Sequence, residues 1–191
     1  MTINKHDKKN SASQKVKAVW VGIFILVAYG VLVSAITDSR FWIMIADVIS
    51  GLAVIGIAVL LSPFFKVFSK KISLGYFLLK ILEGTLMITA GILFLNNSLQ
   101  YVRDWIYNGI HLCIFIASGF IFYYLLYKTK LVPQFISIWG GIAIFALLAT
   151  TVLKLVGLNY PVLDTLLVLI ITNEAFLAIW LMVKGINFKE D

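Results

Sequence analysis

The chain has 191 residues, of which 61% are hydrophobic, 14% are aromatic and only 13% are charged, and its mean hydropathy is +0.99. Soluble domains carry about a quarter charged residues, so the composition excludes an ordinary water-soluble fold and predicts an integral membrane protein. The formal net charge of +7 does not indicate nucleic-acid binding, because the lysines stand between apolar runs rather than on one basic face.

Six apolar runs are each long enough to cross the hydrocarbon core of a bilayer, which takes about 20 helical residues. Helices are expected rather than barrel strands, because the runs are apolar on every face and show no alternation. The predicted helices cover residues 17–37, 41–65, 72–95, 105–127, 131–155 and 161–183. The expected fold class is therefore all-α: a polytopic membrane protein with a bundle of six transmembrane helices.

Lysine and arginine are unevenly distributed over the segments that connect these helices. The N-terminal segment, the second and fourth connections and the C-terminal end carry most of the 16 basic residues. The positive-inside rule then places both termini in the cytoplasm, for a multi-pass protein of the plasma membrane. One transmembrane domain is expected over residues 17–185, with a Lys-rich cytoplasmic tail over 1–16 and a second cytoplasmic tail over 186–191.

A secretory signal peptide is the alternative interpretation of the first apolar run. The lysine-rich start, the apolar stretch and Val33-Ser34-Ala35 resemble the three parts of such a signal. The apolar stretch is longer than the usual signal core, which favours a retained first helix.

Five ionisable residues fall well inside the predicted helices, namely Asp47, Lys80, Glu83, His111 and Glu174. A charge at the bilayer centre costs about 2.5–3.5 kcal/mol on insertion scales, so these side chains are expected to face the bundle interior and to pair. At about 1.5 Å per residue, Glu83 and Glu174 lie about 18 Å from the outer boundary. Lys80 shares the helix face of Glu83. We expect these three side chains to cluster, with one acid keeping its proton because two carboxylates beside one ammonium do not both ionise cheaply.

Two interpretations of this cluster stay open. One is a structural contact that fixes the third helix to the sixth, with Lys80 partly extended towards the cytoplasmic interface. The other is a site that binds a small solute or relays protons, since intramembrane acids are candidates for function. Asn173 points about 100° away from Glu174 on its helix and is a further candidate.

A second, shallower layer contains Asp47 and His111, about 9 Å from the outer boundary. Together with Asn108 and the rim charges they could line an outward-facing polar pocket, in which His111 titrates near neutral pH. In the alternative interpretation, His111 packs between helices and the rim charges are solvated. The rim charges are Arg40, Arg103, Asp104, Lys154 and Asp164.

Signatures of catalysis and of cofactor binding are weak. The chain has no Gly-x-Ser-x-Gly elbow, no P-loop and no dinucleotide glycine fingerprint. Ser118 would lie about 10 Å from His111 along one helix, which is too far for a dyad. Because His6 lies in the tail, one intramembrane histidine predicts neither a zinc centre nor a haem with two histidine ligands. We expect no catalytic residue, no metal and no cofactor, although an intramembrane hydrolase that uses Asp47 and His111 stays open.

Three stretches resemble a bacterial family of six-helix membrane proteins. They are GYFLLKILE over residues 75–83, YYLLYKTKLVP over residues 123–133 and the last helix over residues 174–185. Together they resemble the family known as domain of unknown function 4386. The family pattern has arginine where this chain has Lys80, and often where it has Gln134, so a bidentate guanidinium is missing at these positions. The resemblance implies the six-helix fold over nearly the whole chain and singles out Glu83 and Glu174, but it implies no activity.

These observations favour a protein that binds or transports a small solute or protons through the buried Lys/Glu cluster. A non-catalytic accessory or regulatory membrane subunit is the alternative. The lipid bilayer is the expected partner. A small solute, a lipid, a second copy of the chain and another membrane protein stay open as further partners. The candidate ligand-binding or proton-relay residues are Lys80, Glu83, Glu174, Asp47, His111 and Asn173.

Overall fold

A computed structural model describes residues 5–158 and 160–187, with the side chains of these residues except 5–11, Gln100, Pro161 and Asp164. Among the predicted features, the side chains of His6 and Asp164 and the outer parts of both predicted tails lie outside the described residues. The statements below concern the described part of the chain.

Helices make up the regular structure of these residues. In chain order they are α1 (Lys5–Ala28), the 3₁₀ helix η1 (Tyr29–Ala35), α2 (Arg40–Phe68), α3 (Lys70–Phe94), η2 (Asn97–Leu99), α4 (Gln100–Ile106), the π-helical segment η3 (Tyr107–His111), α5 (Leu112–Thr129), α6 (Gln134–Leu155), α7 (Pro161–Thr165) and α8 (Leu167–Val183). Five helical stretches are long and apolar enough to cross a membrane, and α8 is a shorter apolar helix. The expected all-α, six-helix membrane bundle is confirmed.

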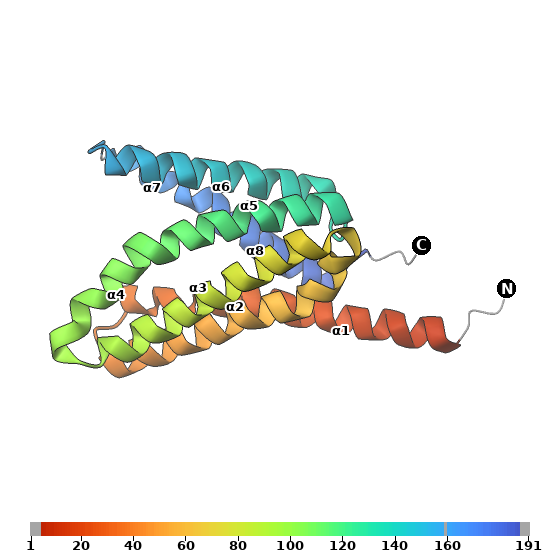
Figure 1. The fold of residues 1–191 in the computed structure, drawn as a ribbon, viewed down its shortest axis with the longest axis horizontal. Coiled ribbons are helices and arrows are strands. Elements are labelled where there is room, and N and C mark those ends of the chain that lie inside the picture. The colour runs from red at the N-terminus through yellow and green to blue at the C-terminus, as the bar shows by residue number, and fades with distance from the viewer. Residues whose placement is uncertain (1–4, 159, 188–191) are drawn as a thin grey trace.

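The start of α1 and the end of α8 lie at the same end of the bundle (Figure 1), which we call the terminal end. The opposite end, where α2 begins and α6 ends, is called the far end. A chain that crosses the membrane an even number of times has both termini on the same side, as observed here. The expectation that the terminal end faces the cytoplasm stays a prediction.

The second, third and fifth predicted helices agree with the observed ones to within three residues at each end, whereas the first, fourth and sixth differ more. The first helix extends back to Lys5 and finishes in the tighter η1, and the fourth begins at Gln100 and contains η3. The predicted sixth helix is interrupted at Leu166, where the Leu169 N–H donates to the Leu166 carbonyl in a three-residue turn. The remaining helix α8 has 17 residues, which is about 26 Å of rise.

The helices α2 and α3 approach each other closely at two glycines. A Cβ atom placed on Gly51 would lie 2.5 Å from the Gly84 carbonyl oxygen, and one on Gly84 would lie 2.5 Å from that of Gly51. Small residues permit such close helix contact in membranes. Because Lys80 and Glu83 share this buried face of α3 with Gly84, the contact turns both charged side chains into the bundle.

Candidate functional site

The ion pair of α3 is the centre of the site. Lys80 Nζ donates to Glu83 Oε1 at 3.0 Å, and the two residues are only 8% and 2% exposed. Their three-residue spacing places them one above the other on the helix. The Ser118 hydroxyl of α5 donates to Glu83 Oε2 at 2.8 Å, and the ammonium lies 5.3 Å from the centroid of the Phe115 ring. Both oxygens of Glu83 are therefore engaged.

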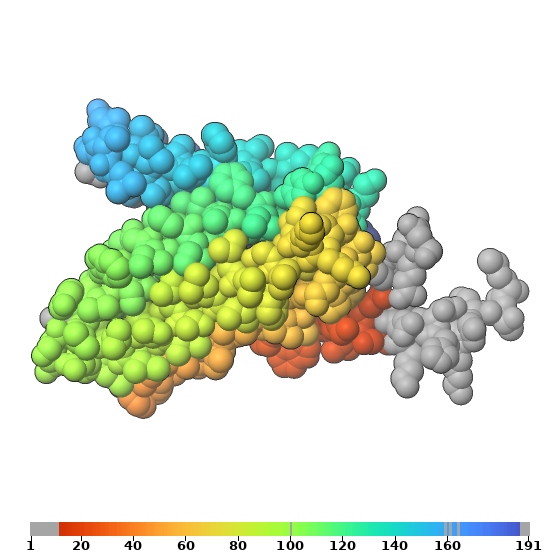
Figure 2. Space-filling view, in the orientation of Figure 1, coloured from red at the N-terminus to blue at the C-terminus, as the bar shows by residue number. Residues whose placement is uncertain are grey.

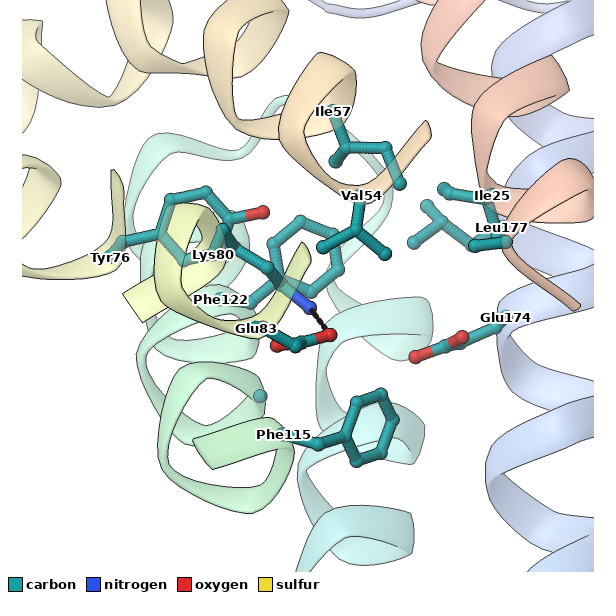
Figure 3. A pocket seen from close by; sticks show the side chains of 12 residues that line it. Ile25, Val54, Ile57, Tyr76, Lys80, Glu83, Phe115, Phe122, Glu174 and Leu177 are labelled. Atoms are coloured by element: carbon teal, nitrogen blue, oxygen red, sulfur yellow. Dashed lines mark hydrogen bonds and ion pairs between the residues drawn. The ribbon is translucent and has the colours of Figure 1, made fainter. Parts of the chain in front are cut away.

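Glu174 enters the same region from α8. Figure 3 shows its side chain reaching towards the Lys80–Glu83 pair from the opposite wall. The Tyr29 hydroxyl of η1 donates to Glu174 Oε2 at 2.9 Å, and no ion pair of Glu174 forms among the described residues. The three predicted cluster members thus surround one space, but the ammonium neutralises only one of the two acids directly.

Two small cavities meet at the two glutamates. The first has a volume of about 50 Å³ and is lined on its terminal side by Tyr76 (Figure 3). The second has a volume of about 100 Å³ and is lined on its far side by Met87 and His111. Glu83 and Glu174 belong to the walls of both. A water molecule takes about 30 Å³ in the liquid, so these spaces suit a few waters, whereas drug-sized ligands occupy about 300–1,000 Å³.

Two residues that line these cavities each carry a buried polar atom without a partner among the described residues. The Tyr76 hydroxyl belongs to a residue that lines the first cavity, His111 Nε2 to one that lines the second, and neither has a hydrogen-bond partner among the described residues. Buried polar atoms nearly always have a partner, in the protein or in ordered water. Both cavities are therefore suited to polar guests, of which water is the smallest.

The side chain of Asn173, the residue before Glu174, does not line the two cavities. Its side-chain Nδ2 donates to the Ile136 carbonyl of α6 at 3.0 Å, while its Oδ1 is buried and has no partner in the described part of the chain. The structure therefore places this candidate in a contact between α6 and α8. Within the described residues, the hydroxyls of Tyr123 and Ser137 are likewise buried and lack a partner.

Asp47 makes a separate ionic group near the far end. Arg103 Nε donates to Asp47 Oδ2 at 2.7 Å and Arg103 Nη2 donates to Oδ1 at 3.0 Å, while the Tyr107 hydroxyl also donates to Oδ1 at 3.0 Å. Asp47 is 0% and Arg103 7% exposed. The guanidinium group lies over the rings of Phe94 and Tyr107, at 5.4 and 4.8 Å from their centroids. We call Asp47, Arg103 and Tyr107 the far-end clasp.

The clasp changes the interpretation of the predicted outer layer. Arg103, expected among the solvated rim charges, is buried against Asp47, and His111 instead lies beside Tyr107 and Phe115 with ring centroids 4.9 and 6.4 Å away. Asp47 is not among the residues that line the cavity at His111. Among the described residues, no hydrogen bond or ion pair joins Asp47 to His111, the two groups on which an intramembrane hydrolase would rely.

Sequence reasoning missed Tyr29 and gave Ser118 a different role. Tyr29 stands in an apolar run that was expected to be ordinary α-helix, and it reaches Glu174 from a 3₁₀ helix. Ser118 was considered only as a nucleophile, but it donates to Glu83. A small hydroxyl inside an apolar helix was the available signal, since such groups often hydrogen-bond across helices in membranes.

Comparison with known proteins gives a match to a protein family. Residues 95–185 match the family described as Domain of unknown function (DUF4386). No curated protein and no solved structure matches the chain. The matched segment includes Ser118 and Glu174, whereas Lys80 and Glu83 precede it. From α4 to α8, the chain therefore resembles the family DUF4386, which bears out the resemblance for the stretches 123–133 and 174–185, while the stretch 75–83 precedes the match.

Proposed function

We propose that this membrane protein takes up and relays protons at Glu83 and Glu174, which we call the carboxylate pair. The proposal rests on one observation: Glu83 of α3 and Glu174 of α8 both line the same two small cavities. Intramembrane acids that face a cavity are candidates for proton relay. The wider proposal, binding of an organic solute, is less well supported because the cavities are small.

The charge balance of the pair supports an exchangeable proton. Lys80 forms an ion pair with Glu83, whereas Glu174 accepts a hydrogen bond from the neutral hydroxyl of Tyr29. Ionising both acids beside a single ammonium leaves a net negative charge in a low-dielectric interior, which favours retention of one proton. Together with the Lys80 ammonium, the pair is then neutral when it holds one proton and has a net charge of −1 when it holds none.

The cavities supply a route for that proton. In the forward direction, a protonated water in the cavity beside His111 gives its proton to the anionic pair and becomes neutral. The protonated pair then releases a proton to a water in the cavity beside Tyr76 and is anionic again. The side-chain atoms of Tyr76 and His111 that lack partners would hold these waters in place.

Proton movement in liposomes tests the proposal. We expect the full chain, reconstituted with a pH-sensitive dye inside the vesicles, to accelerate the collapse of an imposed pH gradient. Glu83→Gln and Glu174→Gln should each lose this acceleration. Asp104→Asn is the matched control, because it neutralises an exposed acid outside the cavities. Wild-type rates in both glutamine variants, shown to be correctly assembled, would contradict the proposal.

A structural role in an accessory membrane subunit is the second candidate. It is favoured by the hydrogen bonds that Glu83 and Glu174 each accept from a neighbouring helix, since such contacts also hold helices together. This candidate predicts that both glutamine variants lower the thermal stability in detergent and that the wild-type chain moves no protons. A protein that co-purifies with the full chain would support it further.

A further inference from the structure

A larger groove lies at the far end, between η3 and the end of α6. Its volume is about 410 Å³, and none of its lining residues belongs to the two cavities of the carboxylate pair. At this end α6 and α7 diverge from α4 in Figure 1, and the surface between these segments is notched in Figure 2. The groove is thus a separate feature of the molecule.

The groove has polar and apolar walls. On α6, Leu147, Thr150, Thr151 and Lys154 follow one another at helical spacing and share one face. Asn108 of η3 adds an amide group. The apolar part of the lining consists of Leu112, Leu147, Leu155 and Leu167. A guest that fits this lining has a polar, negatively charged part and an aliphatic part.

Thr150 gives an independent sign of a guest. Threonines in these helices generally donate their hydroxyl to the carbonyl four residues earlier, as Thr85, Thr129 and Thr151 do. The Thr150 hydroxyl has no partner among the described residues, although the residue is only 2% exposed. A buried donor next to a groove, left without its usual acceptor, indicates that the groove supplies one.

The position of Lys154 matches the depth of lipid headgroups. Lys154 lies in the last turn of α6, so its ammonium reaches the membrane interface rather than the hydrocarbon centre. A lysine ammonium forms strong, charge-assisted hydrogen bonds with phosphate oxygens, whichever side of the membrane the headgroup lies on. Hydroxyl and amide groups near the ammonium complete a set of donors for phosphate oxygens.

We infer that this groove binds an anionic phospholipid, a binding site beyond the proposed proton relay. The phosphate lies at Lys154 and Thr150, and one acyl chain runs along the leucines. The π-helical segment η3 forms one wall, and its Tyr107 also donates to Asp47 of the far-end clasp. A lipid in the groove would therefore contact Tyr107, which is also a member of the far-end clasp.

Native mass spectrometry of the delipidated full chain tests this inference. The chain is titrated with phosphatidylglycerol and, in a parallel arm, with zwitterionic phosphatidylcholine. We expect phosphatidylglycerol to bind more tightly, and Lys154→Gln to weaken its binding about tenfold, the factor that corresponds to about 1.5 kcal/mol, at the lower end for a hydrogen bond to a charged group. Lys154→Arg should keep most of the affinity, because it keeps the charge.

Three further arms make the test specific. Thr150→Val is expected to weaken phosphatidylglycerol binding about twofold to fivefold, since it removes one hydrogen bond. Lys66→Gln, which changes an exposed lysine at the terminal end, should leave the affinity unchanged. Glycerol phosphate should not compete with the lipid at equal concentration, because it lacks the chains. Equal lipid affinity in Lys154→Gln and the wild type, or a stable dimer that forms without lipid and excludes it, would overturn the inference.

Discussion

Among the described residues the chain buries two ionic groups, and they differ in how completely their charges are matched. In the far-end clasp, one guanidinium group binds both oxygens of Asp47 and a tyrosine adds a third hydrogen bond. In the carboxylate pair, one ammonium contacts one of two acids, and two cavities adjoin the unmatched one. The first arrangement is closed and has no spare charge, whereas the second has one acid more than it has bases.

We interpret the far-end clasp as a structural group and the carboxylate pair as a functional one. A fully matched bidentate pair fixes the distance and angle between α2 and α4 and leaves no group to exchange with solvent. A partly matched pair beside a cavity can change its protonation without losing its neighbours. The following predictions test this interpretation, beginning with the largest expected effect.

Arg103→Gln is expected to destabilise the protein most. The substitution leaves the Asp47 carboxylate buried without its cation, and removing one partner of a buried ion pair typically costs about 3–5 kcal/mol. The free energy of unfolding in detergent measures the effect. The double variant Asp47→Asn/Arg103→Gln should recover part of the loss, because no unmatched charge remains. A loss in Arg103→Gln smaller than that in Glu174→Gln would reverse the comparison.

Glu83→Gln is expected to lower stability by about 1.5–3 kcal/mol, the range for hydrogen bonds to charged groups. It removes the ion pair with Lys80 but retains an acceptor for the Ser118 hydroxyl, and Glu174 remains as a second acid in the cavity that Lys80 lines, so the cost is expected to be lower than for Arg103→Gln. The same unfolding measurement applies. Ser118→Ala is the control that removes only the hydroxyl, and it should cost less than Glu83→Gln. If Ser118→Ala costs more, the ion pair contributes less to stability than proposed.

Gly91→Ala tests the clasp by steric means. A Cβ atom at Gly91 would lie 2.7 Å from Asp47 Cβ and 3.2 Å from the Met44 carbonyl oxygen, so α2 and α3 must separate. Overpacking of this kind costs about 1–3 kcal/mol. Gly75→Ala is the matched control on the same helix, since its added Cβ meets nothing within 4 Å. Equal stabilities of the two variants would show that the helices adjust freely at the clasp.

Glu174→Gln is expected to change stability by less than about 1 kcal/mol. The amide oxygen still accepts the Tyr29 hydrogen bond, whose net contribution is in the range of an ordinary hydrogen bond. The proton flux in liposomes should nevertheless be lost. Tyr29→Phe is the complementary variant, and it should retain flux. A large loss of stability in Glu174→Gln, together with normal flux, would assign Glu174 to the structural class.

Much of the fold follows from the sequence, because helices in a membrane satisfy their own backbone hydrogen bonds and need long apolar runs. The similar depth of Glu83 and Glu174 could also be predicted, because the rise of a helix is fixed and residues can be counted from its ends. The Asp47–Arg103 contact was not predicted, because Arg103 precedes the predicted start of the fourth helix at residue 105 and so was counted as a rim charge. The observed helical segment continues back to Gln100. The contact between Tyr29 and Glu174 joins residues that are 145 positions apart in the chain. It depends on how the two helices are rotated towards each other, which a single sequence does not indicate.

The short α8 has a consequence for the electric field across the membrane. Glu174 lies only about 10 Å along the helix from its first residue, Leu167. A bilayer that thins to match a 17-residue helix would concentrate the voltage drop over a shorter distance at this point. A charge that crosses the whole potential gains about 2.3 kcal/mol per 100 mV. A proton that reaches Glu174 from the far end would cross only a fraction of that potential, so its arrival and its release would respond unequally to voltage.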